Sequence, residues 1–236
     1  MLRQPDGFMI NIITKYRINQ RVRYYRIRQR MRIIQAIEFC LCRCYEKRLG
    51  IDTLGVIQPP EKKKNLFRDE NAYEALCYVI RRKILHYLRP GRADVIMDLG
   101  CGKGRAICFF AAERRVKRVI GVELYKGLYE AAVENINNLL IKMSKINTYH
   151  ADVVNFTDID DVTIFLLHNP FGAKTLTKLI KNIEKSLKVN PRTIRIVYYP
   201  TPNLARLFDE TPRLFFKKRL IVMAKSPIYL YGNQKD

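Results

Sequence analysis

The sequence predicts an α/β fold: a doubly wound, mostly parallel sheet of seven strands, preceded by a basic helical extension at the N-terminus. Three observations support this prediction. Short apolar runs alternate with longer amphipathic segments between residues 94 and 199, which is typical of strands and helices in alternation. The apolar runs are nearly continuous, as in parallel strands that are buried on both faces. Two more strand-like runs near the C-terminus indicate an antiparallel hairpin that adds a reversed strand.

The apolar periodicity assigns each element a range. We expect parallel strands at 94–99, 118–123, 146–152, 162–169 and 193–199, and the closing hairpin within 215–233. We expect helices at 70–88, 105–115, 126–143 and 173–189. Asp69 is a natural N-cap for the first of these helices, and Pro90-Gly91 ends it.

The N-terminal segment differs from the rest in charge. Residues 1–50 carry 12 Lys and Arg against three acidic residues. Apolar side chains within 15–48 fit a helical stripe, so we expect a basic amphipathic helix there. Two interpretations stay open: a helix that covers the domain, or a surface that contacts anionic lipid or nucleic acid. The predicted organisation is this extension at 1–50, a connector with Pro59-Pro60 at 51–68, and one α/β domain at 69–236.

Composition restricts the partners and the compartment. The formal net charge of +22 and the pI near 9.9 favour contact with anionic partners such as nucleic acid, anionic lipid or acidic proteins. The six cysteines match neither a disulfide framework nor a metal-site spacing, so we expect free thiols and no metal. With no signal peptide and no membrane-spanning stretch in the sequence, we expect a cytoplasmic protein, with peripheral membrane contact as an alternative.

The stretch "DLGCGKGR" at 98–105 is the first candidate for a ligand site. It lies where the first parallel strand ends and the next helix begins, the position at which such sheets bind ligands. Three glycines there permit positive φ and let a ligand approach the backbone, and the helix N-terminus offers unpaired N–H groups. A tight structural turn needs one glycine and hardly three.

The residues around this loop indicate which ligand it binds. Arg105 stands where a dinucleotide fingerprint has its last glycine, and Lys103 is followed by Gly104 and not by the Ser or Thr of a Walker loop. Glu123, at the end of the next strand, suits two ribose hydroxyls, and Asp98 suits a cationic amine. An ammonium, a ribose and an adenine together describe S-adenosylmethionine.

With these residues, the chain resembles the class I S-adenosylmethionine-dependent methyltransferases from about residue 70 to 199. Four motifs occur in the family's order at the ends of successive strands: "DLGCGKG", "VIGVEL", "HAD" and "LLHNPFG". The chain is more similar still, over roughly residues 50–200, to a poorly characterised bacterial subgroup. That subgroup is distantly similar to the histone-lysine methyltransferases named for disruption of telomeric silencing. The family has a Rossmann-like fold.

This resemblance implies a set of cofactor-binding residues. The methionine end would lie against Asp98, Gly100, Cys101, Gly102 and Gly104. Glu123 would bind the ribose, Leu124 would pack on the adenine, and Asp152 with Val153 would meet the edge of the adenine. Tyr73 matches a tyrosine that in relatives closes over the cofactor, although packing in the core is the more common role of such a residue.

The acceptor side is marked by "NPFG" at 169–172. Asn169, Pro170 and Phe171 partly match the Asn-Pro-Pro-aromatic motif of adenine-amine methyltransferases, and Asn169 is also expected to contact the cofactor. Lysine-methylating relatives also have an Asn followed by a Phe, so the motif favours a nitrogen acceptor of either kind. A proline turn at a strand end explains it equally well. His168 and Tyr198 or Tyr199 are further candidates, with structural roles as the more common alternative.

Three functions remain as hypotheses. The first is methyl transfer to a protein amine of the lysine kind, which the resemblance to the subgroup favours. The second is methyl transfer to an exocyclic amine of RNA or DNA, which the charge and the partial motif favour. The third is a non-catalytic basic protein associated with a membrane or with nucleic acid. The complete glycine loop and the two carboxylates argue against the third.

Overall fold

The computed structural model describes residues 33–57, 73–168, 171–199, 204–221 and 227–234. The chain divides into two compact units, Met1–Arg43 and Cys44–Asp236. Residues 33–43 of the first unit are helical, and so are residues 44–49 of the second. The second unit contains the sheet. In the described part of the chain, no helix combines the length and the apolar character needed to cross a membrane.

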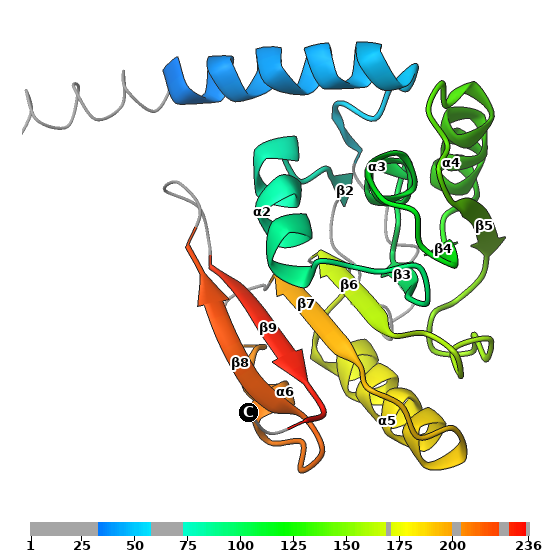
Figure 1. The fold of residues 1–236 in the computed structure, drawn as a ribbon, viewed down its shortest axis with the longest axis vertical. Helices are drawn as coiled ribbons and strands as arrows, with labels where there is room; N and C mark the ends of the chain where they lie inside the picture. The colour runs from blue at the N-terminus through cyan, green and yellow to red at the C-terminus, as the bar shows by residue number, and fades with distance from the viewer. Residues whose placement is uncertain (1–32, 58–72, 169–170, 200–203, 222–226, 235–236) are drawn as a thin grey trace, which may run out of the picture. The chain divides into compact units, whose positions relative to one another are not determined.

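The second unit is built on a seven-stranded sheet in the order β5-β4-β3-β6-β7-β9-β8 (Figure 1). Neighbouring strands are parallel from β5 to β7, whereas β9 is antiparallel to both β7 and β8. The bounds are β3 Val95–Leu99, β4 Arg118–Glu123, β5 Lys145–His150, β6 Ile164–His168, β7 Arg195–Tyr199, β8 Phe215–Leu220 and β9 Ile228–Gly232. The predicted fold class, a doubly wound and mostly parallel sheet with a reversed strand, is therefore confirmed.

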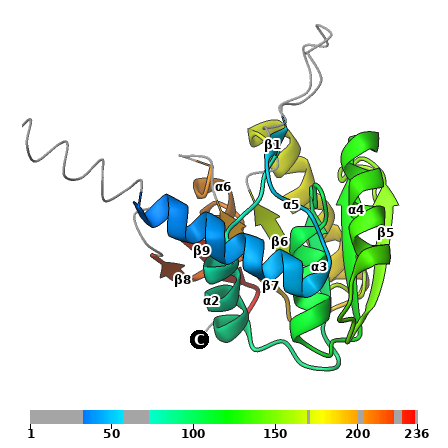
Figure 2. The ribbon, with the colours of Figure 1, turned by 90° about the horizontal axis from the view of Figure 1, so that it is seen from above.

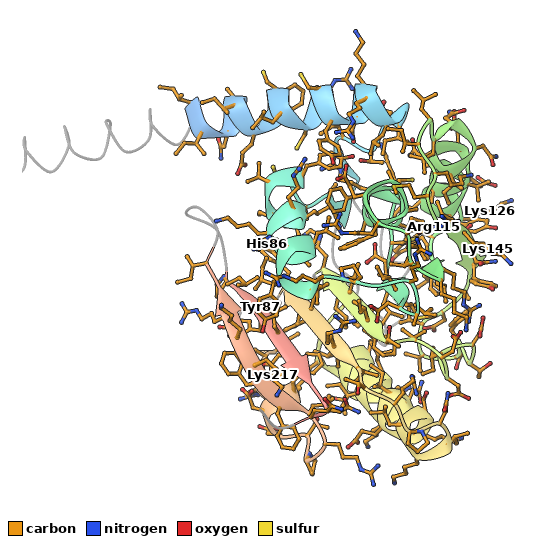
Figure 3. The ribbon with its side chains drawn as sticks, viewed as in Figure 1. His86, Tyr87, Arg115, Lys126, Lys145 and Lys217 are labelled. Carbon is orange, nitrogen blue, oxygen red and sulfur yellow. The ribbon has the colours of Figure 1, made fainter. Side chains whose placement is uncertain are left out.

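Helices cover both faces of the sheet (Figures 1 and 2). On one face lie α2 (Tyr78–Leu88), α3 (Arg105–Glu113) and α4 (Lys126–Asn138); on the other lies α5 (Ala173–Val189), with the short α6 (Arg206–Asp209) beside it. Side chains fill the space between the layers (Figure 3). The register of α5 follows from its sequence, because apolar residues recur every three or four positions and those side chains are buried: Leu176, Leu179, Ile180, Ile183 and Leu187.

The central strand β3 contributes to both faces of the sheet. All five of its residues are buried, as expected for a parallel strand between two helical layers. Val95, Met97 and Leu99 belong to the large hydrophobic cluster that includes the buried face of α5. Side chains alternate along a strand, so Asp98 points to the other face, where α2 and α3 lie. The buried carboxylate of Asp98 therefore lies on the face of the sheet that α2 and α3 cover.

The helix predicted at 70–88 begins later than the sequence indicated, at Tyr78. Tyr73 and Glu74 form the short strand β2, which pairs antiparallel with β1 (Val56–Ile57). The carbonyls of Ala75 and Leu76 accept hydrogen bonds from the Arg105 guanidinium, and that of Leu76 also accepts one from Arg81. These carbonyls are occupied by arginine side chains, so the chain has no need of helical bonds there.

The helix predicted at 126–143 ends early, at Asn138. Leu139 is extended, with ψ of 112°, and the next N–H, that of Leu140, donates to the carbonyl of Leu49 at 2.9 Å. Met143 N–H donates to the carbonyl of Ala111. The apolar pattern in the sequence extends to residue 143 although α4 ends at Asn138. Residues 139–143 instead form hydrogen bonds to Leu49 and Ala111. A tertiary partner here overrides helix propensity.

Arg105, in the first turn of α3, is the centre of a buried polar network. Its guanidinium forms an ion pair with Glu46 at 3.0 Å, and both side chains are at most 3% exposed. Its Nε donates to the Thr53 hydroxyl at 2.6 Å, and Thr53 N–H in turn donates to Glu46. The centre of the Tyr78 ring lies 5.2 Å from the guanidinium carbon. This network fixes the segment 46–53 against the start of α3.

We expect Arg105→Met to lower the free energy of unfolding by about 3–5 kcal/mol, because the change leaves Glu46 as an uncompensated buried charge. Urea denaturation measures it. Arg118→Met is the matched control: Arg118 pairs with Asp158 and Asp161 nearer the surface, so its loss should cost about 1 kcal/mol or less. The double variant Arg105→Met/Glu46→Met should recover part of the loss. Equal costs for the two single variants would contradict the prediction.

Candidate active site

The glycine loop connects β3 to α3 at the carboxyl edge of the sheet. Gly100, Gly102 and Gly104 have φ of 82°, 56° and 82°, the left-handed region that favours glycine. A side chain on Gly104 would also be crowded, because its Cβ would lie 3.2 Å from the Cβ of Ala132 on α4. The loop thus requires glycine for its path, and it presents the N-terminus of α3 to the space outside the sheet.

Backbone hydrogen bonds tie this loop to the end of β4. The N–H groups of Gly100 and Cys101 both donate to the carbonyl of Val122, at 2.9 and 3.0 Å. Gly102 N–H donates to Glu123 Oε2 at 2.8 Å, and Tyr125 N–H donates to Glu123 Oε1 at 2.9 Å. The two strand ends that the sequence assigned to one ligand therefore lie side by side.

Asp98 lies below the loop, 5% exposed. Its carboxylate accepts no hydrogen bond from the residues that the structure describes. Burial raises the pKa of Asp98 to about 7; the charge of Arg81 opposes this rise, and the charge of Glu123 adds to it. A buried carboxylate in this state is stabilised by a cation that binds beside it.

Glu123 is the second buried carboxylate at this edge. Burial raises its pKa, while the N–H groups of Tyr125 and Gly102 favour the charged form and limit the rise. Oε2 accepts the N–H of Gly102 and Oε1 that of Tyr125, and the N–H of Leu124 also favours the charged form, while the carboxylate retains lone-pair capacity for ligand hydroxyls. Glu123 thus combines two functions: it holds the glycine loop in place and it can accept hydrogen bonds from outside.

The end of β5 completes this part of the site. Ala151 N–H donates to the carbonyl of Glu123 at 3.0 Å, and Asp152 Oδ1 accepts the N–H of Val154 at 2.9 Å. Leu124 and Asp152 are half-buried, so a ligand can reach both. Val153 is different: it is 7% exposed and belongs to the hydrophobic core.

His150 is a residue that the sequence reasoning missed. Its Nε2 lies 2.9 Å from the carbonyl oxygen of Leu124, and its ring stacks on Tyr129 of α4 with the ring centroids 5.5 Å apart. It thereby links the segments that follow β4 and β5. The only signal in the sequence is its place just before Asp152 at the end of a strand.

The acceptor side is described in part. His168 and Tyr199 are register partners at the carboxyl ends of β6 and β7, with ring centroids 4.8 Å apart. Phe171 is 6% exposed and belongs to the hydrophobic core, as does the buried Tyr198. Asn169 and Pro170, the other two residues predicted for this motif, lie outside the described residues.

One predicted site residue lies in a different element from the one expected. Tyr73, predicted in a helix before the first strand, lies in β2.

Gly121 on β4 pairs with Asp98 in the register of the sheet, and its lack of a side chain makes room for the glycine loop. A Cβ on Gly121 would lie 2.9 Å from both Cys101 Sγ and Ile107 Cδ1. A glycine inside a predicted strand was the available signal for this close approach.

Comparisons with known proteins identify the family of this chain. Residues 96–190 match the family model described as a methyltransferase domain. A protein-lysine N-methyltransferase from Saccharolobus islandicus (strain REY15A) is 32% identical over 118 residues, which are 48% of this chain and 68% of the relative. The chain belongs to the class I S-adenosylmethionine-dependent methyltransferases. It contains the cofactor-binding domain of these enzymes.

Solved structures have the same fold as this methyltransferase. The human methyltransferase 10 domain containing protein has a TM-score of 0.57 at 14% identity, over 84% of this chain and 96% of that one. An RNA methyltransferase from Salinibacter ruber, in complex with S-adenosyl-L-homocysteine, has a TM-score of 0.50 at 14% identity, over 69% and 95%. At these identities the likeness concerns the fold, which is the S-adenosylmethionine-binding fold.

The close approach at Gly121 predicts a selective effect of one methyl group. Gly121→Ala should destabilise the enzyme by about 1–3 kcal/mol, because the new Cβ displaces the glycine loop or Ile107. It should also weaken binding of S-adenosylhomocysteine, measured by calorimetric titration. Gly127→Ala is the control, since no atom lies within 4 Å of its Cβ position. Unchanged stability and affinity in Gly121→Ala would contradict the role given to this glycine.

The raised pKa of Asp98 predicts how stability depends on pH. Without cofactor, folded Asp98 holds a proton up to about pH 7, whereas the unfolded group loses it near its ordinary value of 3.8. Stability should therefore fall as pH rises from about 4 to 7. Asp98→Asn should reduce this fall, leaving the part that the raised pKa of Glu123 contributes, and should be more stable than wild type at pH 8 by up to about 4 kcal/mol. Urea denaturation at pH 4 and pH 8 measures it, and parallel pH profiles of the two proteins would overturn the assignment.

Proposed function

We propose that this enzyme transfers the methyl group of S-adenosylmethionine to the side-chain amine of lysine in proteins. The observation that carries this proposal is the 32% identity to a protein-lysine N-methyltransferase, over two thirds of that relative's length. The matched family domain, residues 96–190, contains the glycine loop, Glu123 and the segment that follows β6.

The residues at the carboxyl edge fit the cofactor. Asp98, buried and without a hydrogen bond from the described residues, would hold the α-ammonium of the methionine end. The backbone of Gly100, Cys101, Gly102 and Gly104 would lie against that end, where glycine lets it approach closely. Binding of this ammonium would return Asp98 to its charged form. Part of the cofactor's binding energy would then come from giving a partner to a buried carboxylate that accepts no hydrogen bond from the described residues.

The nucleoside end would occupy the neighbouring strand ends. Glu123 would accept hydrogen bonds from the two ribose hydroxyls, for which it has free lone pairs. Leu124 would pack on one face of the adenine, and Asp152 would meet its edge together with the backbone near Val153. Tyr73, which lies in β2, stays a candidate for closing over the cofactor.

The reaction needs little chemistry from the protein. The cofactor supplies a methyl carbon whose bond to the sulfonium sulfur breaks as a bond to the neutral lysine nitrogen forms, leaving S-adenosylhomocysteine and a protonated methylamine. The surplus proton leaves with solvent. The protein's task is to align the amine with the methyl group. Asn169, Pro170 and Phe171 would provide this alignment, with the His168–Tyr199 pair beside them.

The net charge of the chain indicates what kind of sequence surrounds the substrate lysine. A net charge of +22 repels a lysine that is surrounded by other cations, and it attracts a lysine in an acidic sequence. The proposed substrates are therefore lysines that lie among Asp and Glu residues. Methyl transfer to an exocyclic amine of RNA or DNA is the second candidate, favoured by the same charge and by the partial motif at 169–171.

The test combines cofactor binding with a choice of acceptors. S-adenosylhomocysteine should bind wild type, and Asp98→Ala should bind it roughly ten- to a hundredfold more weakly, as for a lost charged hydrogen bond. With methyl-labelled S-adenosylmethionine, we expect label on lysine in acidic peptides. We expect less on lysine-rich basic peptides and none on RNA oligonucleotides. No cofactor binding would overturn the site, whereas binding with label on RNA alone would overturn the acceptor.

A further inference from the structure

A surface of aliphatic and cationic side chains surrounds the loop that joins α4 to β5. Leu140 is 72% exposed and Met143 is 50% exposed, both unusually high for large apolar residues. Four exposed cations accompany them. We call this surface the Leu140 face, and it consists of Leu140, Met143, Arg48, Arg114, Arg115 and Lys142.

The backbone around the Leu140 face is held firmly. Leu140 N–H donates to the carbonyl of Leu49 at 2.9 Å, and Met143 N–H donates to the carbonyl of Ala111 at 2.8 Å. The Ser144 hydroxyl donates to the carbonyl of Arg114 at 2.6 Å. The loop is therefore anchored to the residue that follows Arg48 and to the end of α3. Its two apolar side chains project from a fixed scaffold.

The charges on this side of the unit are mainly positive. Glu113 lies among the cations, and its carboxylate is engaged by Arg48 at 3.7 Å and by the Tyr45 hydroxyl. Lys145, at the start of β5, extends the cationic character of this side (Figure 3), whereas Lys126 on α4 pairs with Glu130 at 3.6 Å. The sequence of residues 1–32 adds nine Lys and Arg against one acidic residue, and this composition favours the same anionic partners.

We propose that the Leu140 face docks the enzyme on the surface of an anionic lipid bilayer. Leu140 and Met143 would enter the boundary between headgroups and acyl chains, where apolar area is removed from water. The four cations around them would meet lipid phosphates and carboxylates. Neither kind of contact alone anchors a protein firmly, but the two together do.

The composition of the face favours lipid over nucleic acid. Proteins that bind single strands place aromatic rings among their cations, because bases stack on rings. The six residues of the face include no aromatic side chain, and its apolar members are aliphatic. Insertion of solvent-exposed aliphatic side chains into a bilayer removes their apolar surface from water and is favourable, whereas contact with a phosphate backbone stabilises them little.

The Leu140 face lies away from the glycine loop, so docking there would not cover the proposed cofactor site. Arg114 and Arg115 follow the C-terminal end of α3, whereas the glycine loop precedes its N-terminal end. This inference goes beyond the proposed function and does not depend on the identity of the methyl acceptor.

The absence of tryptophan from the chain permits a direct test. Leu140→Trp in the full chain gives a single indole fluorophore on the face. With mixed phosphatidylcholine–phosphatidylserine vesicles its emission should shift to the blue, and lipids brominated in the acyl chain should quench it. Vesicles of phosphatidylcholine alone should produce neither effect. Val189→Trp is the matched control, because Val189 on α5 is aliphatic and 69% exposed but lies outside the face.

A second pair of variants tests the contribution of the face to binding. Leu140→Glu/Met143→Glu should lower the partition onto mixed vesicles roughly tenfold or more in co-sedimentation, since two apolar contacts are lost and two like charges face the lipid. Val189→Glu should bind as wild type does. Each change of a cation of the face to Ala should lower the partition by about fivefold. Binding of S-adenosylhomocysteine should be unchanged in all of them, which excludes misfolding.

Three results would overturn the proposal. The first is an equal response of the Leu140→Trp and Val189→Trp variants to the mixed vesicles. The second is normal vesicle binding by the Leu140→Glu/Met143→Glu variant. The third is a loss of RNA binding in that double variant without a loss of vesicle binding, which would assign the face to nucleic acid.

Discussion

The ion pair between Arg105 and Glu46 is the constraint on which the arrangement of the glycine loop and the start of α3 depends. Arg105 follows directly after the glycine loop, so its position sets where α3 begins. It is held by Glu46, by the Thr53 hydroxyl and by the carbonyls of Ala75 and Leu76. Asn135 on α4 adds a second tie, since its amide donates to the carbonyls of Lys103 and Asp52. One oxygen of Glu46 finds no partner among the described residues, so the network keeps some of its desolvation cost.

The buried carboxylates at the sheet edge are the second feature that governs this protein. Asp98 and Glu123 are each 5% exposed, and burial raises the pKa of both. A chain with a net charge of +22 nevertheless leaves Asp98 without a hydrogen bond from the described residues. Stability is thus lowered locally at Asp98, where we propose that the ammonium of the cofactor binds, and shifted pKa values of this kind are common at functional sites. The two proposals assign different ligands to these charges: anionic lipid to the cationic Leu140 face, and the ammonium of the cofactor to the buried carboxylate of Asp98.

Much of the fold could be predicted because local pattern and tertiary structure agree. The strand at 118–123 and the helix at 173–189 have the predicted bounds, since buried parallel strands and amphipathic helices leave distinct periodicities. The errors fall where a distant partner decides. Residues 75 and 76 are kept from helix by Arg105, and α4 is stopped by a bond from Leu140 to Leu49. Motifs located the loop, Glu123 and Asp152. No local pattern could reveal that Glu46, 59 positions earlier, holds Arg105, or that His150 joins two loops.

The length of α3 relates the two surfaces of the enzyme. Its nine residues rise about 13 Å, with the glycine loop before one end and Arg114 and Arg115 of the Leu140 face after the other. The same helix packs on Tyr45 and Tyr78 through Phe109, and its first residue is fixed by the buried ion pair. If the Leu140 face docks as proposed, α3 would connect the docked surface to the glycine loop through a helix whose first residue is held by Glu46 and Thr53.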